Sequence, residues 1–214
     1  MEKLYKGIHE FRESYFIKEE DFFKRLSKSQ KPEVLFITCS DSRVDPNLVT
    51  QSKPGELFIV RNVGNIIPPY DAIKDKNSVV AAIEFAVLVL KVKDIILCGH
   101  SDCGAMEALY MDNKELDKMP HLRDWLKIAS PAKDVVNSYY RDLSGNARYR
   151  ITEEENILIQ LRNIETYPFV VQALNDATLH LHGWYYDIGT GKVYSYNPGK
   201  DAFEQIVYND GKDR

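Results

Sequence analysis

Three short apolar runs, separated by longer stretches with helical spacing, constrain the fold of this chain more than any other feature. They cover residues 34–38 (VLFIT), 57–60 (LFIV) and 95–98 (IILC). Continuous apolar runs of this length, partly β-branched, are typical of strands buried on both faces. Parallel strands require crossover connections, so the pattern predicts an α/β fold with a mostly parallel central sheet of about four to five strands flanked by helices.

The rest of the chain fits the same architecture. Further helices are predicted over residues 78–90, 104–111 and 120–140. The run Thr152-Glu153-Glu154-Glu155 matches a capping box that opens a helix ending near Ile164. Residues 179–188 and 193–196, on either side of Gly189-Thr190-Gly191, predict a closing strand and hairpin.

The N-terminal segment differs in pattern from the remainder of the chain. Residues 1 to about 30 carry apolar side chains at a roughly helical spacing among many charges, and Pro32 ends the segment. This predicts amphipathic helix in one or two pieces. We therefore expect one domain overall, made of a helical arm over residues 1–31 and an α/β part over residues 32–214.

Charge and cysteine content restrict the partners and the compartment. Of 214 residues, 28 are Lys or Arg and 32 are Asp or Glu, and the formal charge of -4 argues against nucleic acid or an anionic membrane as partner. Three cysteines are an odd number in a chain with no dense cysteine pattern, and the N-terminus lacks the apolar core of a secretory signal. We expect reduced thiols in the cytoplasm and no membrane-spanning segment.

Reactive side chains gather at the predicted carboxyl ends of two strands. Cys39-Ser40-Asp41-Ser42-Arg43 follows the first strand, and Gly99-His100-Ser101-Asp102-Cys103-Gly104 follows the third. Ligands of open parallel sheets bind outside those strand ends, so the two loops can meet although they lie far apart in the sequence.

Cys39, His100 and Cys103 form a candidate metal site. Two thiolates and one imidazole favour zinc over hard cations, and three protein ligands with one open position are typical of catalytic zinc. Asp41 and Arg43 lie two residues apart and can form a bidentate pair that keeps the carboxylate ionised. Released from Arg43, Asp41 is near enough to Cys39 in sequence to become a fourth ligand and close the site.

Other interpretations of these residues are less favoured. A redox domain would need Cys-x-x-Cys, which is absent, and a phosphatase loop would not place a carboxylate between its cysteine and arginine. A non-catalytic zinc module would keep the three ligands but has no need of Asp41 and Arg43. Cys98 lies inside an apolar run, where a buried inert thiol is the expected role.

The two loops resemble the signature of the β-class carbonic anhydrases. Residues 61–70 (RNVGNIIPPY), 82–86 (AIEFA) and 182–184 (HGW) are also similar to that family, so the resemblance covers roughly residues 28–190. It implies a carbonate dehydratase, a lyase that hydrates CO2 reversibly to bicarbonate and a proton by means of hydroxide on one Zn²⁺ per chain. It also assigns Cys39, His100 and Cys103 to the metal, and Asp41 with Arg43 to a catalytic dyad.

The resemblance further implies a pocket and an assembly. The substrate pocket maps onto Gln30, Phe58 and Phe85 and is shared between two subunits of a homodimer or a higher assembly, with a tetramer favoured. The N-terminal helices are expected to wrap a neighbouring subunit. Gly104, which follows a ligand cysteine at a helix start, is a further candidate for binding substrate through its backbone N–H.

Two positions refine the assignment. Phe85 stands where many relatives carry Tyr, so a hydroxyl that could serve a proton path is missing. Phe36 stands where the bicarbonate-inhibited subtype usually has Trp, which favours the open-site subtype of plants and cyanobacteria, with Asp41 off the metal near neutral pH. An enzyme on the same scaffold that hydrolyses carbonyl sulfide or carbon disulfide remains the nearest alternative.

Overall fold

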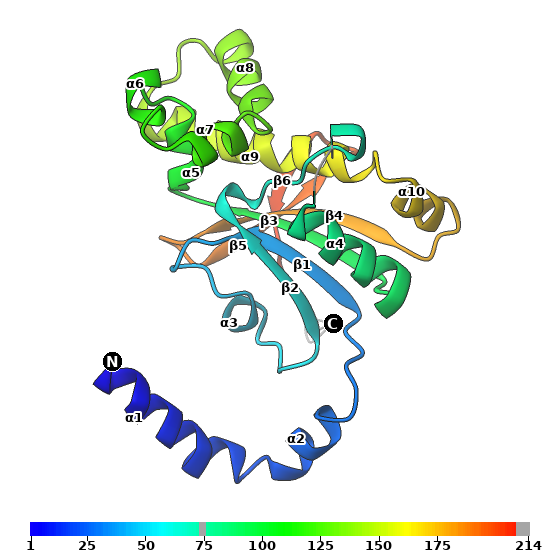
Figure 1. Ribbon diagram of the computed structural model, residues 1–214. Helices are drawn as coiled ribbons and strands as arrows, with labels where there is room; N and C mark the ends of the chain where they lie inside the picture. The colour runs from blue at the N-terminus through cyan, green and yellow to red at the C-terminus, as the bar shows by residue number, and fades with distance from the viewer. Residues whose placement is uncertain (73–75, 209–214) are drawn as a thin grey trace, which may run out of the picture.

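Six strands form one mixed sheet in the computed structural model, which describes residues 1–72 and 76–208. The strand order is β2-β1-β3-β4-β5-β6 (Figure 1). The strands are β1 (Val34–Cys39), β2 (Leu57–Asn62), β3 (Asp94–His100), β4 (His180–Asp187), β5 (Lys192–Asn197) and β6 (Ala202–Gln205). The first four are parallel and the last two antiparallel, so the predicted α/β class and mostly parallel sheet are confirmed. The short strand β6 comes in addition to those expected from sequence.

In the described part of the chain, ten α-helices connect the strands or precede them. They are α1 (Glu2–Glu10), α2 (Glu20–Leu26), α3 (Pro46–Thr50), α4 (Ser78–Glu84), α5 (Gly104–Ala108), α6 (Asn113–Leu116), α7 (Pro120–Leu126), α8 (Ser130–Tyr139), α9 (Gly145–Ile164) and α10 (Pro168–Asn175). Two π-helical segments, η1 (Phe11–Phe16) and η4 (Phe85–Leu90), continue α1 and α4, and the 3-10 turns are η2 (Val63–Asn65) and η3 (Tyr70–Ala72). Within the described ranges, every helix is too short or too polar to span a lipid bilayer.

The strand order places the functional loops next to each other. Strand β1 pairs with β2 on one side and with β3 on the other, so the chain reverses its direction of winding at β1. Cys39 ends β1 and His100 ends β3, and both strands end at the same edge because they are parallel. Ligands of doubly wound sheets bind at such a switch point.

The two faces of the sheet are covered differently. Leu35 and Ile37 of β1 point to the large core that α4, η4, α9 and α10 complete. Phe36 points to the opposite face, where it packs with Ile96 and Cys98 and makes a T-shaped contact with the Trp184 ring. The connection from β1 to β2 contains only the five-residue helix α3. Several apolar side chains on this second face are therefore only half-buried.

Helix α9 begins earlier than the sequence predicts. It starts at Gly145 after the N-cap residue Ser144, so Thr152 lies inside the helix and the predicted capping box is wrong. The Thr152 hydroxyl donates a hydrogen bond to the carbonyl of Arg148, one turn earlier, and lies 2.8 Å from the Tyr110 hydroxyl. A Ser or Thr can bond to the i−4 carbonyl within a helix as readily as it caps one, so the local pattern is ambiguous.

The N-terminal arm extends away from the rest of the molecule (Figure 1). It contains α1, η1 and α2, which confirms the predicted helical segment. No residue of these helices is buried, and large apolar side chains such as Leu4, Tyr5 and Ile8 are 60–65% exposed. At the other end, residues 209–214 of the expected 32–214 part lie outside the described residues.

Candidate metal centre

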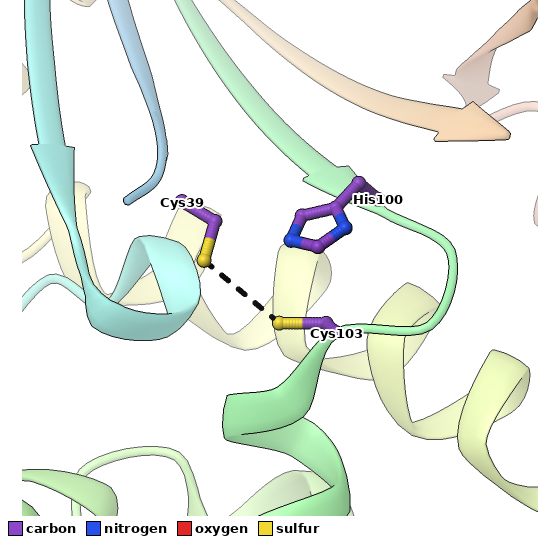
Figure 2. A group of neighbouring side chains, drawn as sticks. All are labelled: Cys39, His100 and Cys103. Carbon is purple, nitrogen blue, oxygen red and sulfur yellow. Dashed lines mark hydrogen bonds between the residues drawn. The ribbon is translucent and has the colours of Figure 1, made fainter. Parts of the chain in front are cut away.

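Three side chains from two loops converge at the carboxyl edge of the sheet (Figure 2). Cys39 is the last residue of β1, His100 is the last residue of β3, and Cys103 is the N-cap of α5. All three are at least 95% buried, and their ligand atoms lie within 4.8 Å of one another. The structure therefore brings together the three residues that the sequence selected from distant segments.

The separation of the two sulfur atoms fits a shared metal ion. The Sγ atoms of Cys39 and Cys103 lie 4.0 Å apart. Two thiolates at about 2.3 Å from a tetrahedral zinc would lie about 3.8 Å apart, which is close to the observed distance. A disulfide would need an S–S distance of about 2.05 Å, and all three cysteines of the chain are free.

His100 has one ring nitrogen held by the protein and one without a partner. Nδ1 lies 2.9 Å from the carbonyl oxygen of Ser101. Nε2 is buried and has no hydrogen-bond partner among the described residues. Metal-ligating histidines commonly donate one ring N–H to a carbonyl, which leaves the other nitrogen for the ion. The orphaned Nε2, together with two thiols, fits a zinc ion.

The two thiols titrate as a pair. The pKa of Cys39 is lowered, chiefly by the hydrogen bond from Cys103 and further by His100 and the Gly64 amide, although burial opposes this shift. The pKa of Cys103 is raised, because it is the partner that keeps the proton and because it is buried. Without an ion, the cluster therefore favours one thiolate beside one thiol, and the Cys39 sulfur is prepared for metal binding.

Asp41 and Arg43 form the bidentate pair that their spacing predicted. Arg43 Nε donates to Asp41 Oδ1 at 2.9 Å and Nη2 donates to Oδ2 at 2.7 Å, while the backbone N–H of Arg43 donates to Oδ1 at 2.9 Å. These bonds hold the pKa of Asp41 well below its usual range. The carboxylate is therefore ionised at any physiological pH.

Two further contacts connect this pair to both loops. Arg43 Nη2 also donates to the carbonyl of Asp102 at 2.8 Å, and Asp102 holds a left-handed backbone with φ of 54°. Arg61 on β2 donates to the carbonyl of Cys39 at 3.0 Å and to that of Asp41 at 2.6 Å. No individual role for Arg61 is predicted from the sequence. In the structure, its guanidinium group joins the backbone carbonyls on either side of Ser40.

The predicted pocket residues lie apart from this cluster within the chain. Phe58 is paired with Leu35, four positions before Cys39 on β1, so it lies about 13 Å along the strand from the metal ligands. Its ring centroid is 5.9 Å from that of Phe85, which is 40% exposed. Gln30 is exposed in the segment between α2 and β1. Only Gly104, the first residue of α5, adjoins a ligand.

Helix α9 supports the Cys103 loop through a side chain that sequence reasoning did not select as a site residue. Glu153, 3% exposed, accepts the backbone N–H of Cys103 at 2.8 Å and the hydroxyl of Tyr185 at 2.9 Å. Burial raises the pKa of Glu153 to about 7. The only signal in the sequence is a glutamate in a helix that also carries core residues, and its local pattern matches a helix cap instead.

Comparison with known proteins gives a consistent result. A family model described as carbonic anhydrase matches residues 34–193. A carbonic anhydrase of Synechocystis sp. is 46% identical over 197 residues, which are 92% of this chain and 71% of that protein. The structure of the beta-carbonic anhydrase CcaA superposes with a TM-score of 0.93 at 45% identity, covering 96% of this chain and 99% of that chain. Tetrameric beta-carbonic anhydrases of Sordaria macrospora superpose with a TM-score of 0.79 at 27% identity, covering 91% and 97%.

Proposed function

Because the chain belongs to the β-class carbonic anhydrases, which hydrate CO2 reversibly to bicarbonate and a proton, we propose that it does so with one zinc ion held by Cys39, His100 and Cys103. The observation that carries this proposal is the convergence of three soft donors within 4.8 Å at the switch point of the sheet. A bound zinc ion would supply the Lewis acidity that lowers the pKa of water and so would provide the nucleophile for CO2.

Asp41 orients that nucleophile. The Arg43 fork occupies one lone pair or more on each carboxylate oxygen, keeps Asp41 ionised and fixes its plane. A remaining lone pair accepts a hydrogen bond from the attacking water and directs its oxygen at the carbon of CO2. A closed state, in which Asp41 becomes a fourth metal ligand at low pH, requires all three bonds to Arg43 to break.

Gln30, Phe58 and Phe85 form pocket walls for a second copy of the chain, while Gly104 binds substrate beside its own metal. The distance of about 13 Å between Phe58 and Cys39 along the strands supports this division. Antiparallel pairing of two β2 strands around a two-fold axis would bring Phe58 of one copy toward the carboxyl end of β1 in the other. Apolar walls suit a small, uncharged substrate and exclude competing water.

The edge of the sheet supports this assembly. Among the described residues, β2 pairs only with β1, and its apolar side chains remain half-buried. An uncovered apolar edge strand readily pairs with another chain. The helical arm over residues 1–31 exposes further apolar side chains, and we place it against the half-buried sheet face of a neighbour. A dimer follows, and the tetrameric relatives of Sordaria macrospora support a dimer of dimers.

The proposed compartment is the cytoplasm. Cys39, Cys98 and Cys103 are free thiols, and thiolate ligands must stay reduced to hold a metal. An oxidising compartment would threaten the Cys39–Cys103 pair, whose sulfur atoms are 4.0 Å apart.

Metal content and CO2 hydration test the proposed site together. The wild type is expected to contain about one zinc ion per chain, and Cys39→Ser should lose both the metal and the activity. Cys98→Ser is the matched control, because Cys98 is buried on the other sheet face, and it should keep both. Full zinc occupancy without CO2 hydration in the wild type would favour a non-catalytic zinc-binding module over an enzyme. Assaying carbonyl sulfide hydrolysis on the same sample tests the alternative substrate.

Mixed assemblies test the shared pocket. Cys39→Ser and Phe85→Asp are each expected to be inactive alone. If the pocket is shared, a dimer with one copy of each variant has one intact site, so random mixing restores about a quarter of wild-type activity. If each chain builds its own pocket, mixing restores nothing. The Phe85 side chain is 40% exposed, so the substitution leaves the fold intact.

The arm is tested by the mass of the assembly in solution. Replacing Leu4 and Ile8 by Ser removes two exposed apolar side chains of α1 and is expected to shift the population toward smaller species. Tyr139→Ser on α8 removes an even more exposed aromatic side chain outside the arm and should leave the mass unchanged. Unchanged mass in both variants would contradict the proposed role of the arm.

A further inference from the structure

One face of α9 carries a ladder of three amide side chains, two of them buried and the third partly buried. Asn156 and Gln160 are 1% and 0% exposed, and with Asn163 they follow a helical spacing that puts all three on one side. Asn156 Oδ1 accepts from Gln160 Nε2 at 2.9 Å, and Asn163 Nδ2 donates to Gln160 Oε1 at 3.0 Å. The metal ligands do not contact these three amides directly, and the mechanism above does not use them.

The ladder binds the backbone of the segment after β2. Asn156 Nδ2 donates to the carbonyl of Gly64 at 3.0 Å. Gln160 Oε1 accepts the N–H of Ile67 at 2.8 Å, and Asn163 Nδ2 donates to the carbonyl of the same residue at 2.8 Å. Buried backbone groups require such partners, so the ladder allows this irregular segment to cross the core.

Gly64 connects the ladder to the metal centre. Its N–H donates to Cys39 Sγ at 3.4 Å, while its carbonyl accepts from Asn156. Its φ of 79° is a left-handed conformation, and a Cβ there would lie 3.0 Å from Ala105 Cβ and 3.1 Å from Met106 Cε. The residue therefore has little freedom, and Asn156 is the side chain that fixes its carbonyl.

We propose that Asn156 is a positioning residue of the metal centre, which acts through Gly64 by holding the Gly64 N–H on the Cys39 sulfur. The proposal rests on the zinc site described above. Without Asn156, the buried Gly64 carbonyl has no hydrogen-bond donor, and the peptide groups of Gly64 rotate toward another partner. The N–H then moves off the sulfur, and the thiolate loses a contact that holds it in position for the metal. Partners of this kind change metal affinity about 10- to 100-fold.

The test compares two positions of the same ladder. Asn156→Leu removes the donor to Gly64, and the matched control Asn163→Leu removes the donor to Ile67 at the far end. Both leave a buried carbonyl unpaired, and Asn156→Leu also leaves Gln160 Nε2 without its acceptor, so both variants should lower the denaturant midpoint of unfolding. If Asn156→Leu does not fold, Asn156→Ser removes the same amide donor with a smaller change.

The readouts are the absorption spectrum of the cobalt-loaded protein and the rate of metal release to a chelator. Loss of a hydrogen bond to sulfur raises its lone-pair energy, so the sulfur-to-cobalt charge-transfer band of the Asn156 variant should move to longer wavelength. Its metal release should be about 10-fold faster or more. Asn163→Leu should keep the wild-type band and a release rate within about twofold.

Each outcome separates the two proposals. If the wild type shows no sulfur-to-cobalt band, the metal site itself is wrong. If the wild type has the band and the Asn156 and Asn163 variants change equally, or neither changes, the ladder is structural only and the positioning role is refuted while the metal site stands.

Discussion

Gly99→Ala is expected to destabilise the protein through a single clash with α9. Gly99 lies in β3, just before the ligand His100, and a Cβ there would lie 2.8 Å from Ile157 Cδ1 and 2.9 Å from Ile157 Cγ1. Ordinary van der Waals contacts start at 3.4 Å, so the Ile157 side chain or helix α9 must move by about 0.6 Å. Ile157 is fully buried in the main core and has no free space to enter.

The expected magnitude comes from this overlap. Overpacking of this kind costs about 1–3 kcal/mol. For a chain of this length, that corresponds to a fall in Tm of about 2–4 °C for each kcal/mol. Gly7→Ala is the matched control, because Gly7 lies in α1 with nothing within 4 Å of an added Cβ. That variant should be at least as stable as the wild type, since Ala favours helix.

Denaturant unfolding of the zinc-loaded protein, followed by circular dichroism, measures the loss. A double-mutant cycle with Ile157→Ala then identifies its cause. Ile157→Ala alone should cost about 2–5 kcal/mol. Because it removes both clashing atoms, the double variant should lose less than the sum of the two single losses. Strict additivity, or a wild-type midpoint for Gly99→Ala, would refute the reasoning.

The site and its surroundings give three further predictions. Arg43→Gln should lower kcat/KM by about 100-fold with zinc content unchanged, because Asp41 loses the two hydrogen bonds from the guanidinium group. Stopped-flow CO2 hydration and metal analysis measure the two quantities, and a wild-type rate would contradict the prediction. Burial raises the pKa of Cys98 to about 12, so a thiol reagent should leave Cys98 unmodified in the folded protein until it unfolds, as mass spectrometry of the digested protein would show. Burial raises the pKa of Glu153 from 4.5 to about 7, so its contribution to stability is fully present below about pH 4.5 and is lost as the pH rises through about 7. In Glu153→Gln, the free energy of unfolding should therefore vary less with pH between these two values. A pH dependence equal to that of the wild type would count against the assignment.

The sequence is sufficient to predict the sheet because its strands carry strong local patterns. The runs at 34–38, 57–60 and 95–98 form β1, β2 and β3. β1 and β3 are buried on both faces, as continuous apolar runs predict, whereas β2 is a half-buried edge strand. The predicted start of α9 is wrong, since Thr152 bonds to a carbonyl one turn back instead of capping. Strand β6 has no comparable pattern, because only Phe203 of its four residues is even half-buried.

The site is predictable where its residues cluster in sequence. Cys39, Asp41 and Arg43 share one loop, and His100 and Cys103 share another, so spacing alone indicates their chemistry. Arg61 and Glu153 bond to backbone groups of those loops, and Asn156 bonds to Gly64 beside them. No local pattern indicates which carbonyl or N–H a distant side chain will contact. Such contacts depend on tertiary structure and become visible only when the strands and α9 are in place.

The two sulfur donors come from segments that are far apart in the sequence, and this has a mechanical consequence. Cys39 and Cys103 are 64 residues apart in the sequence, so an ion that joins them closes a long loop as a cross-link would. On a chain-entropy basis, a link of that span is equivalent to about 4 kcal/mol of restraint on the unfolded chain. An ion bound there would therefore tie the end of β1 to the start of α5, and separating these two segments would require loss of the ion.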